Sequence, residues 1–301
     1  MDLKNKTKNY YFLLFTLLLL LTFPSFCKAV ILYLEPSSGE FSLGDVFSVS
    51  ILVDTEKENI NVVNVDLNYS SDILTAKDFS QGNSILNLWV EKPEINKGVG
   101  KISFTGGIPG GFKGNKGFLG KVFFETKKEG RAEVFFEDSS EILLNDGFGT
   151  KADLERKKAT FNISAEVLRI PEDQLQKEIE KDNIPPEPFV VEINQSPSIF
   201  EGKYFITFNT TDKQTGVDHF EVKEGKRDWK IVSSPYLLEN QNLGEEIKVK
   251  VVDKAGNERV ESIKPRAVKP VIDWRLIVKI VLVILVIIIF YFIYRRLRKR
   301  K

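Results

Sequence analysis

The 301-residue chain contains one cysteine and one histidine. The cysteine, Cys27, lies in an apolar stretch near the N-terminus, so a chain that has lost this stretch carries no thiol. Disulfides, zinc thiolates and a thiolate nucleophile are then excluded. A single histidine, His219, excludes a multi-histidine metal site, and its place at the start of a predicted strand indicates an ordinary residue. The protein must therefore be held together by burial of apolar side chains.

The central part of the chain also lacks an excess of positive charge. Lys and Arg number 43 and Asp and Glu 42, but four lysines precede residue 30 and eight basic residues follow from Arg275 onward. With Asp2 set aside, 31 basic and 41 acidic residues remain between these ends, a charge of about −10 that repels nucleic acid and anionic lipid. We therefore exclude nucleic acid as a partner.

The N-terminal residues 1–29 have the pattern of a secretory signal peptide. Three lysines precede an apolar run over residues 11–21, and a small residue, Ala29, offers a cleavage point. A lipoprotein signal would use Cys27 as its anchor, but that signal needs small residues just before the cysteine, and Phe26 is bulky. We expect an exported chain cleaved after Ala29.

The C-terminal region has the pattern of a transmembrane helix over residues 275–294. Its apolar part would reach about 28 Å as a helix, close to the ~30 Å hydrocarbon thickness of a bilayer. The flanking residues predict a cytoplasmic tail over residues 295–301 and an ectodomain outside the cell. The boundary residues assigned to this anchor are Trp274, Arg275, Arg295 and Arg296.

Short runs with a two-residue apolar period recur from residue 30 to residue 165 and predict β-strands. Turn sequences separate these runs, and no pattern of a helix of ten or more residues interrupts them. The spacing favours a β-sandwich or jelly roll. Between two of the runs lies FTGGIPGGFKGNKGF (residues 104–118), whose glycines suggest a phosphate loop. Because a strand and not a helix follows, we interpret it as a wide hairpin loop.

Four motifs in this region resemble the cohesin family. They are GDVFSV (44–49), LNYSSDIL (67–74), GKISF (100–104) and GFLGKVFF (117–124), in that order and spacing. The resemblance implies a non-catalytic, nine-stranded jelly roll that holds dockerin modules. It also implies that the segment GGIPGGFKGNKG is a surface loop with solvated lysines.

The resemblance places a partner-binding face on the strand at residues 62–69, where alternation turns Asn64, Asp66 and Asn68 outward. Cohesins commonly have an acidic residue at the position of Asn64, and another where this chain has Gly106 and Gly107. A solvated sheet face is the alternative reading of these three residues. Trp89 is a further candidate, either as an exposed sugar platform or as a largely buried residue.

A second β domain is predicted over residues 189–264, after a charged and proline-rich linker in which a short helix can begin at Pro171. The segments DKQTGVDHFEV (212–222) and VVDKAGN (251–257) resemble bacterial immunoglobulin-like or fibronectin type III-like modules, which serve as spacers. Asp253, Gly256 and Asn257 predict a tight turn. A calcium site is an open alternative there, although the spacing matches no EF-hand loop.

The sequence therefore predicts an all-β, non-catalytic surface protein without a cofactor and with no assigned metal ligand. Three functions stay open: capture of a dockerin-like protein module, direct binding of polysaccharide, and a purely structural stalk. The predicted segments are a signal peptide (1–29), a cohesin-like β-sandwich (30–165), a linker (166–188), an immunoglobulin-like β domain (189–264), a juxtamembrane stem (265–274), a transmembrane helix (275–294) and a basic tail (295–301).

Overall fold

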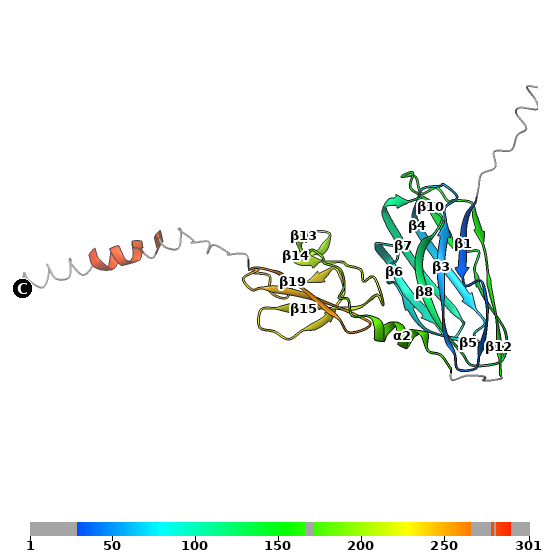
Figure 1. The fold of residues 1–301 in the computed structure, drawn as a ribbon. Coiled ribbons are helices and arrows are strands. Elements are labelled where there is room, and N and C mark those ends of the chain that lie inside the picture. The colour runs from blue at the N-terminus through cyan, green and yellow to red at the C-terminus, as the bar shows by residue number, and fades with distance from the viewer. Residues whose placement is uncertain (1–28, 166–170, 266–277, 280, 290–301) are drawn as a thin grey trace, which may run out of the picture.

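The computed structural model describes residues 29–165, 171–265, 278–279 and 281–289 (Figure 1). Regular structure within these ranges is almost entirely β, with strands β1–β19, the helix α2 and a helical run near the C-terminal end. The strands form two separate β domains, each with its own hydrophobic core. The all-β class predicted from the sequence is confirmed.

The first domain is a sandwich of two sheets. One sheet has the order β11-β1-β3-β8-β5, and the other has the order β2-β12-β9-β4-β7-β6 with β10 also paired to β4. Twelve strands build these sheets, where the family resemblance implies nine. Their bounds are Val30–Glu35 (β1), Ser38–Ser42 (β2), Val46–Asp54 (β3), Ile60–Tyr69 (β4), Leu74–Ser80 (β5), Leu88–Asn96 (β6), Lys101–Phe112 (β7), Gly117–Thr126 (β8), Gly130–Phe136 (β9), Glu141–Leu144 (β10), Leu154–Arg156 (β11) and Ala159–Ser164 (β12).

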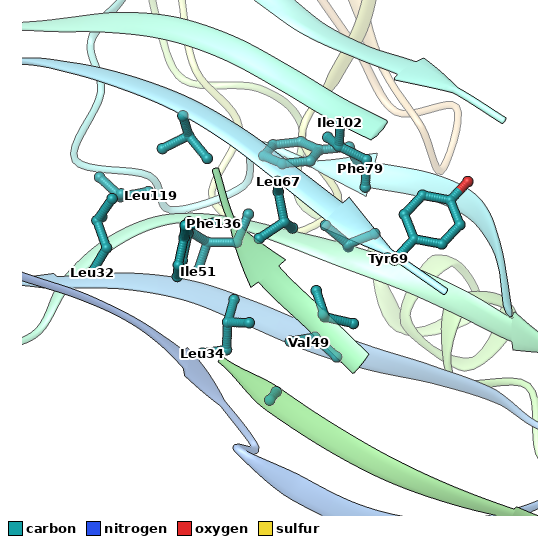
Figure 2. Packing of buried hydrophobic residues seen from close by; sticks show 14 of the residues in the cluster. Leu32, Leu34, Val49, Ile51, Leu67, Tyr69, Phe79, Ile102, Leu119 and Phe136 are labelled. Carbon is teal, nitrogen blue, oxygen red and sulfur yellow. The ribbon is translucent and has the colours of Figure 1, made fainter. Parts of the chain in front are cut away.

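The core lies between the two sheets, where alternate side chains of each strand meet. On β4, Val63, Val65 and Leu67 are fully buried, while the residues between them are partly exposed. Figure 2 shows side chains of β1 and β3, such as Leu34 and Val49, facing the residues of β4. The two-residue period read from the sequence therefore gives the correct inward face of this strand.

The glycine-rich segment is mostly strand, so the predicted surface loop is wrong over residues 106–112. Because β7 continues to Phe112, only residues 113–116 separate it from β8. Gly106 is buried, and a Cβ there would lie 2.7 Å from Leu86 Cδ1, so glycine makes room for a core leucine. Gly110 and Gly111 have the positive φ angles, 88° and 81°, that favour glycine at the end of the strand.

The linker contains a helix that packs on the first domain. Helix α2 spans Gln174–Lys181, and Asp173 caps it by accepting a hydrogen bond from Gln176 N. The Gln174 side chain accepts hydrogen bonds from the backbone N–H and the hydroxyl of Ser48, both at 3.0 Å. Glu178 forms an ion pair with Lys121 at 2.8 Å. The helical part of the linker thus packs on β3 and β8 of the first domain.

The second domain has a three-stranded sheet of order β13-β14-β17 and a four-stranded sheet of order β16-β15-β18-β19. Its core includes Ile206, Phe208, Phe220 and Val249. The assignment to immunoglobulin-like modules stays a prediction. The strand bounds are Glu192–Ser196 (β13), Ile199–Thr207 (β14), Val217–Glu224 (β15), Lys230–Val232 (β16), Tyr236–Leu237 (β17), Ile247–Asp253 (β18) and Glu258–Ile263 (β19).

The two domains touch directly at one end of the first domain (Figure 1). Lys254 Nζ lies 2.6 Å from both carboxylate oxygens of Asp78 and 2.7 Å from the carbonyl oxygen of Phe79. The Ser80 hydroxyl donates a hydrogen bond to the carbonyl oxygen of Thr215 at 3.0 Å. Contacts of this kind fix one domain against the other.

Several predicted segments lie outside the described residues. These are the signal peptide up to residue 28, the stem beyond residue 265, the basic tail and the anchor residues Trp274, Arg275, Arg295 and Arg296. Within the predicted transmembrane segment, residues 278–279 and 281–289 are helical with exposed side chains. In the part of the chain that the structure describes, no helix combines the length and the apolarity needed to cross a membrane.

Candidate partner-binding face

The outward surface of β4, with its neighbours β6, β7 and the β9–β10 segment, gathers polar side chains into one connected group. Asn64, Asp66 and Asn68 all lie on this surface and are partly exposed, as alternation predicted. We call this surface the polar face. Its members are Asn64, Asp66, Asn68, Glu91, Lys101, Thr105, Glu137 and Ser139.

An ion triad occupies the centre of the polar face. Lys101 Nζ lies 3.0 Å from an oxygen of Asp66 and 2.7 Å from an oxygen of Glu137. The Asn68 amide donates to the second oxygen of Glu137 at 2.6 Å, and the Ser139 hydroxyl donates to Asp66 at 2.5 Å. These contacts hold the five side chains in one arrangement before any partner binds.

The triad shifts the acidity of its members. Hydrogen bonds from Lys101 and then Asn68 hold the pKa of Glu137 below its ordinary value. Burial raises the pKa of Asp66, but the bond from Ser139 and the bond and charge of Lys101 outweigh it, so the pKa is lowered overall. The hydrogen bond to Glu137, followed by the one to Asp66, raises the pKa of Lys101. All three groups are therefore charged at neutral pH.

A second row of polar side chains crosses the same face, two residues along β4 from Asp66. Thr105 pairs with Asn64 on one side and with Glu91 on the other. Its hydroxyl lies 2.8 Å from a Glu91 carboxylate oxygen and 3.3 Å from the Asn64 side-chain oxygen. One carboxylate and one amide are thus held at the surface near the edge strand β6.

An apolar row lies next to these polar rows. Leu88 of β6 pairs with Gly107 of β7, which pairs with Val62 of β4, which pairs with Leu143 of β10. The Leu88 side chain is 53% exposed. A Cβ built at Gly107 would lie 3.7 Å from it, so the leucine lies beside a position of β7 that has no side chain. Phe135 adds a further exposed ring beside Asn68. The face therefore combines an apolar strip with preset polar groups.

Trp89 does not belong to this face. It packs against the core of the first domain, with ring centroids 5.7 Å from Phe104 and 6.4 Å from Phe79, both in edge contacts. Part of the ring lines a cavity of about 350 Å³ between the domains, together with Phe208 and Phe220. The structure therefore separates Trp89 from Asn64, Asp66 and Asn68.

The sequence analysis missed five of the polar-face residues and the apolar row. Lys101 and Thr105 had a usable signal, because alternation on β7 turns them outward beside buried Ile102 and Phe104. Glu137 and Ser139 follow the end of β9 and reach the face through a turn, for which a strand period gives no signal.

Removal of the central lysine is expected to raise the pKa values of both carboxyls of the triad. In Lys101→Met, Glu137 and Asp66 should titrate nearer their ordinary values of 4.5 and 3.8, because the hydrogen bonds and charge that favour the ionised forms are lost. Carboxyl-detected NMR titration measures the shift. With folded pKa values depressed, the pairing stabilises the fold above the ordinary values and is lost as pH falls through the lowered ones.

The matched control is Lys77→Met, which removes a lysine paired with Glu125 at 3.3 Å on the other sheet. It should leave the Glu137 and Asp66 titrations unchanged. An unaltered Glu137 titration in Lys101→Met would show that the triad does not form in solution.

Comparison with known proteins finds similarity at the level of solved structures. No protein-family model and no curated protein match the chain. A non-cellulosomal cohesin from the archaeon Archaeoglobus fulgidus is 20% identical, with 45% of this chain and 90% of that chain covered and a TM-score of 0.37. A cohesin module from a family 33 glycoside hydrolase of Clostridium perfringens is 12% identical, with 48% and 97% covered and a TM-score of 0.36.

A type I cohesin–dockerin complex from Clostridium thermocellum gives a further match. The identity is 16%, with 45% of this chain and 93% of that chain covered and a TM-score of 0.35. Each match covers less than half of this chain and nearly the whole of the solved module. The similarity to cohesins read from the sequence motifs is thus found again among solved structures. At these identities and TM-scores it carries no inference about a ligand.

Proposed function

We propose that the first domain is a non-catalytic binding module that captures a small protein module of the dockerin type on its polar face and adjoining apolar row. The observation that carries this proposal is the apolar strip of Leu88, Val62 and Leu143 beside a preset polar network. Protein interfaces commonly have such a composition, with an apolar core and a polar rim. The family resemblance of the sequence motifs supports the same partner class.

The geometry favours binding without large rearrangement. The triad side chains already make two to three polar contacts each, so a partner would not have to order them. Preset side chains reduce the entropic cost of association. The carboxylates of Asp66, Glu91 and Glu137 outnumber the single lysine on the face, which favours a partner surface with positive charge or hydrogen-bond donors.

The packing of Trp89 argues against polysaccharide as the ligand of this domain. A sugar platform needs an aromatic face open to solvent, whereas Trp89 is only partly exposed, packs against Phe79 and Phe104, and lines the cavity between the domains. This placement weakens the case for Trp89 as a sugar platform. A purely structural stalk is the remaining alternative, and the experiment below separates it from the proposal.

We also propose that the module is displayed outside the cell. The signal peptide pattern of residues 1–29 and the apolar segment 275–294 support export and retention by one C-terminal crossing. In this arrangement the second domain and the linker helix hold the binding domain away from the membrane. The polar face would then be open to partners in the surroundings of the cell.

Binding to a panel of purified dockerin modules tests the proposed function. We expect the purified chain to bind at least one of them in isothermal titration calorimetry. Leu88→Lys should weaken that binding roughly tenfold or more, because it puts a charge into the apolar centre of the interface. The matched control is Ile231→Lys, which changes an aliphatic residue that is 73% exposed on β16 of the second domain, and it should bind as the unaltered chain does.

The other outcomes decide between the alternatives. Equal binding by Leu88→Lys and Ile231→Lys would remove the polar face and its apolar row as the site. Binding on a glycan array with no dockerin bound would favour the carbohydrate function. No binding in either assay would leave the structural stalk.

A further inference from the structure

Three buried carboxylates meet where the linker joins the second domain. Asp182 follows the last residue of α2, Asp212 lies in the loop between β14 and β15, and Asp253 ends β18. Their exposed fractions are 7%, 2% and 2%. One carboxylate oxygen of each lies within 4.8 Å of those of the other two.

The spacing of these oxygens suits a shared cation. Ca²⁺ binds oxygen ligands at about 2.3–2.6 Å, so two ligands of one ion are at most about 5 Å apart. Three buried negative charges close together are strongly unfavourable without a positive partner. The nearby Lys254 forms its ion pair with Asp78. None of the three carboxylates forms an ion pair with a described residue.

A second observation, independent of the clustering, also points to a ligand. Asp212 Oδ2 is buried and has no hydrogen-bond partner among the described residues. Its sister oxygen Oδ1 accepts hydrogen bonds from Gln214 N at 2.9 Å and Gly216 N at 2.8 Å. A buried carboxylate oxygen without a partner is costly, and a bound cation would satisfy it.

The other two carboxylates are held rigidly by local hydrogen bonds. Asp253 Oδ1 accepts from Ala255 N at 2.9 Å and Asn257 N at 2.8 Å, which confirms the tight turn predicted there. Asp182 Oδ2 accepts from both the backbone N–H and the hydroxyl of Thr215, at 3.1 and 2.6 Å. These bonds occupy one oxygen of each carboxylate and orient it. The other oxygen of Asp253, Oδ2, accepts a single bond from Asn257 Nδ2 at 2.9 Å, and that of Asp182, Oδ1, accepts from Ile184 N at 3.1 Å and lies 3.5 Å from Asn257 Nδ2, so Asp253 Oδ2 keeps an acceptor site for an ion.

We propose that Asp182, Asp212 and Asp253 bind one Ca²⁺ ion. The three residues lie 30 and 41 positions apart in the sequence, so no local motif reveals the site. The ion would tie the linker to two loops of the second domain. The sequence analysis assigned no metal ligand, and its open alternative of calcium at the Asp253 turn is here extended to a site built from three segments.

The position of the site gives it a mechanical consequence. Asp182 continues directly from α2, which is fixed to the first domain through Ser48 and Lys121. The Thr215 hydroxyl donates a hydrogen bond to Asp182, and the Thr215 carbonyl oxygen accepts one from Ser80 of the first domain. An ion at this point therefore fixes the second domain relative to the first. This proposal is independent of what the polar face binds.

Calcium titration of the purified full chain tests the site. After treatment with a chelator and its removal, isothermal titration calorimetry with CaCl₂ should show one ion per chain with a Kd of about 10⁻⁴ M or lower. Asp212→Asn should weaken this binding at least tenfold. The matched control is Asp228→Asn at an exposed position of the same domain, and it should bind Ca²⁺ as the unaltered chain does.

Thermal unfolding separates a metal site from a merely structural role of Asp212. Calcium at 5 mM should raise the Tm of the unaltered chain and of Asp228→Asn by about 5 °C and that of Asp212→Asn by less than about 1 °C. In chelator, Asp212→Asn should be at least as stable as the unaltered chain, because it removes one of three repelling charges. The proposal would be overturned if Asp212→Asn were less stable than the unaltered chain by the same amount with and without calcium. Tighter binding of Mg²⁺ than of Ca²⁺, or no bound ion at 10 mM CaCl₂, would overturn it as well.

Discussion

Phe47→Ala is expected to destabilise the first domain by about 3–5 kcal/mol, the range for large-to-small substitution of a buried aromatic residue. Phe47 is 1% exposed and lies where three other rings meet. Its ring is stacked on Phe41 at 3.8 Å between centroids and lies 5.0 Å from Phe161 and 6.0 Å from Phe124. Truncation leaves a cavity among rigid neighbours that cannot collapse to fill it.

Urea denaturation followed by tryptophan fluorescence measures this loss, because Trp89 reports on the first domain and Trp229 on the second. The matched control is Phe148→Ala, at a ring that is 90% exposed, and it should change the free energy of unfolding by less than about 0.5 kcal/mol. Equal effects of the two substitutions would show that Phe47 is not at the centre of the core.

Glu224→Ala is expected to destabilise the second domain by a similar amount, about 3–5 kcal/mol. The Glu224 carboxylate is buried and accepts hydrogen bonds from Glu239 N at 2.9 Å, Asn240 N at 2.8 Å and the Tyr236 hydroxyl at 3.2 Å. Alanine would leave these donors without their acceptor. The matched control is Glu246→Ala, whose side chain is 44% exposed, with an expected change below about 0.5 kcal/mol.

Tyr236 supplies a second measurement on the same variant. Burial, followed by the charges of Glu224 and Glu239, raises the pKa of Tyr236 to about 12 from 10.0. A raised tyrosine pKa means that its contribution to stability is complete below pH 10.0 and is lost as pH rises toward about 12. In Glu224→Ala the Tyr236 pKa should fall, and an unchanged value in NMR titration would contradict the contact.

Sequence patterns located the strands whose two-residue period is strong. The predicted strand at residues 62–69 lies wholly within β4, and the motif at residues 117–124 lies wholly within β8. The edge strand β6 was missed because its exposed residues do not alternate cleanly, as its two register shifts against β7 indicate. Glycines misled the interpretation of β7, since Gly106 serves packing against Leu86 and not a turn.

The candidate sites were only partly predictable for a related reason. Alternation alone placed Asn64, Asp66 and Asn68 outward, because the period of a strand is a local property. Their partners Glu137 and Ser139 lie about 70 positions away, in the turn that follows β9, and they reach the face because β9 pairs with β4. The grouping of Asp182, Asp212 and Asp253 likewise depends on how the linker meets two loops, which no single segment encodes.

Methyl NMR of the full chain with a saturating dockerin module tests the central claim most directly, because it identifies the surface that a partner covers. We predict that the methyl signals of Leu88, Val62 and Leu143 shift on binding, while those of Ile231 and Val260 in the second domain stay in place. Shifts confined to the second domain, with the signals of the apolar row unchanged, would contradict the assignment of the polar face and its apolar row as the binding site.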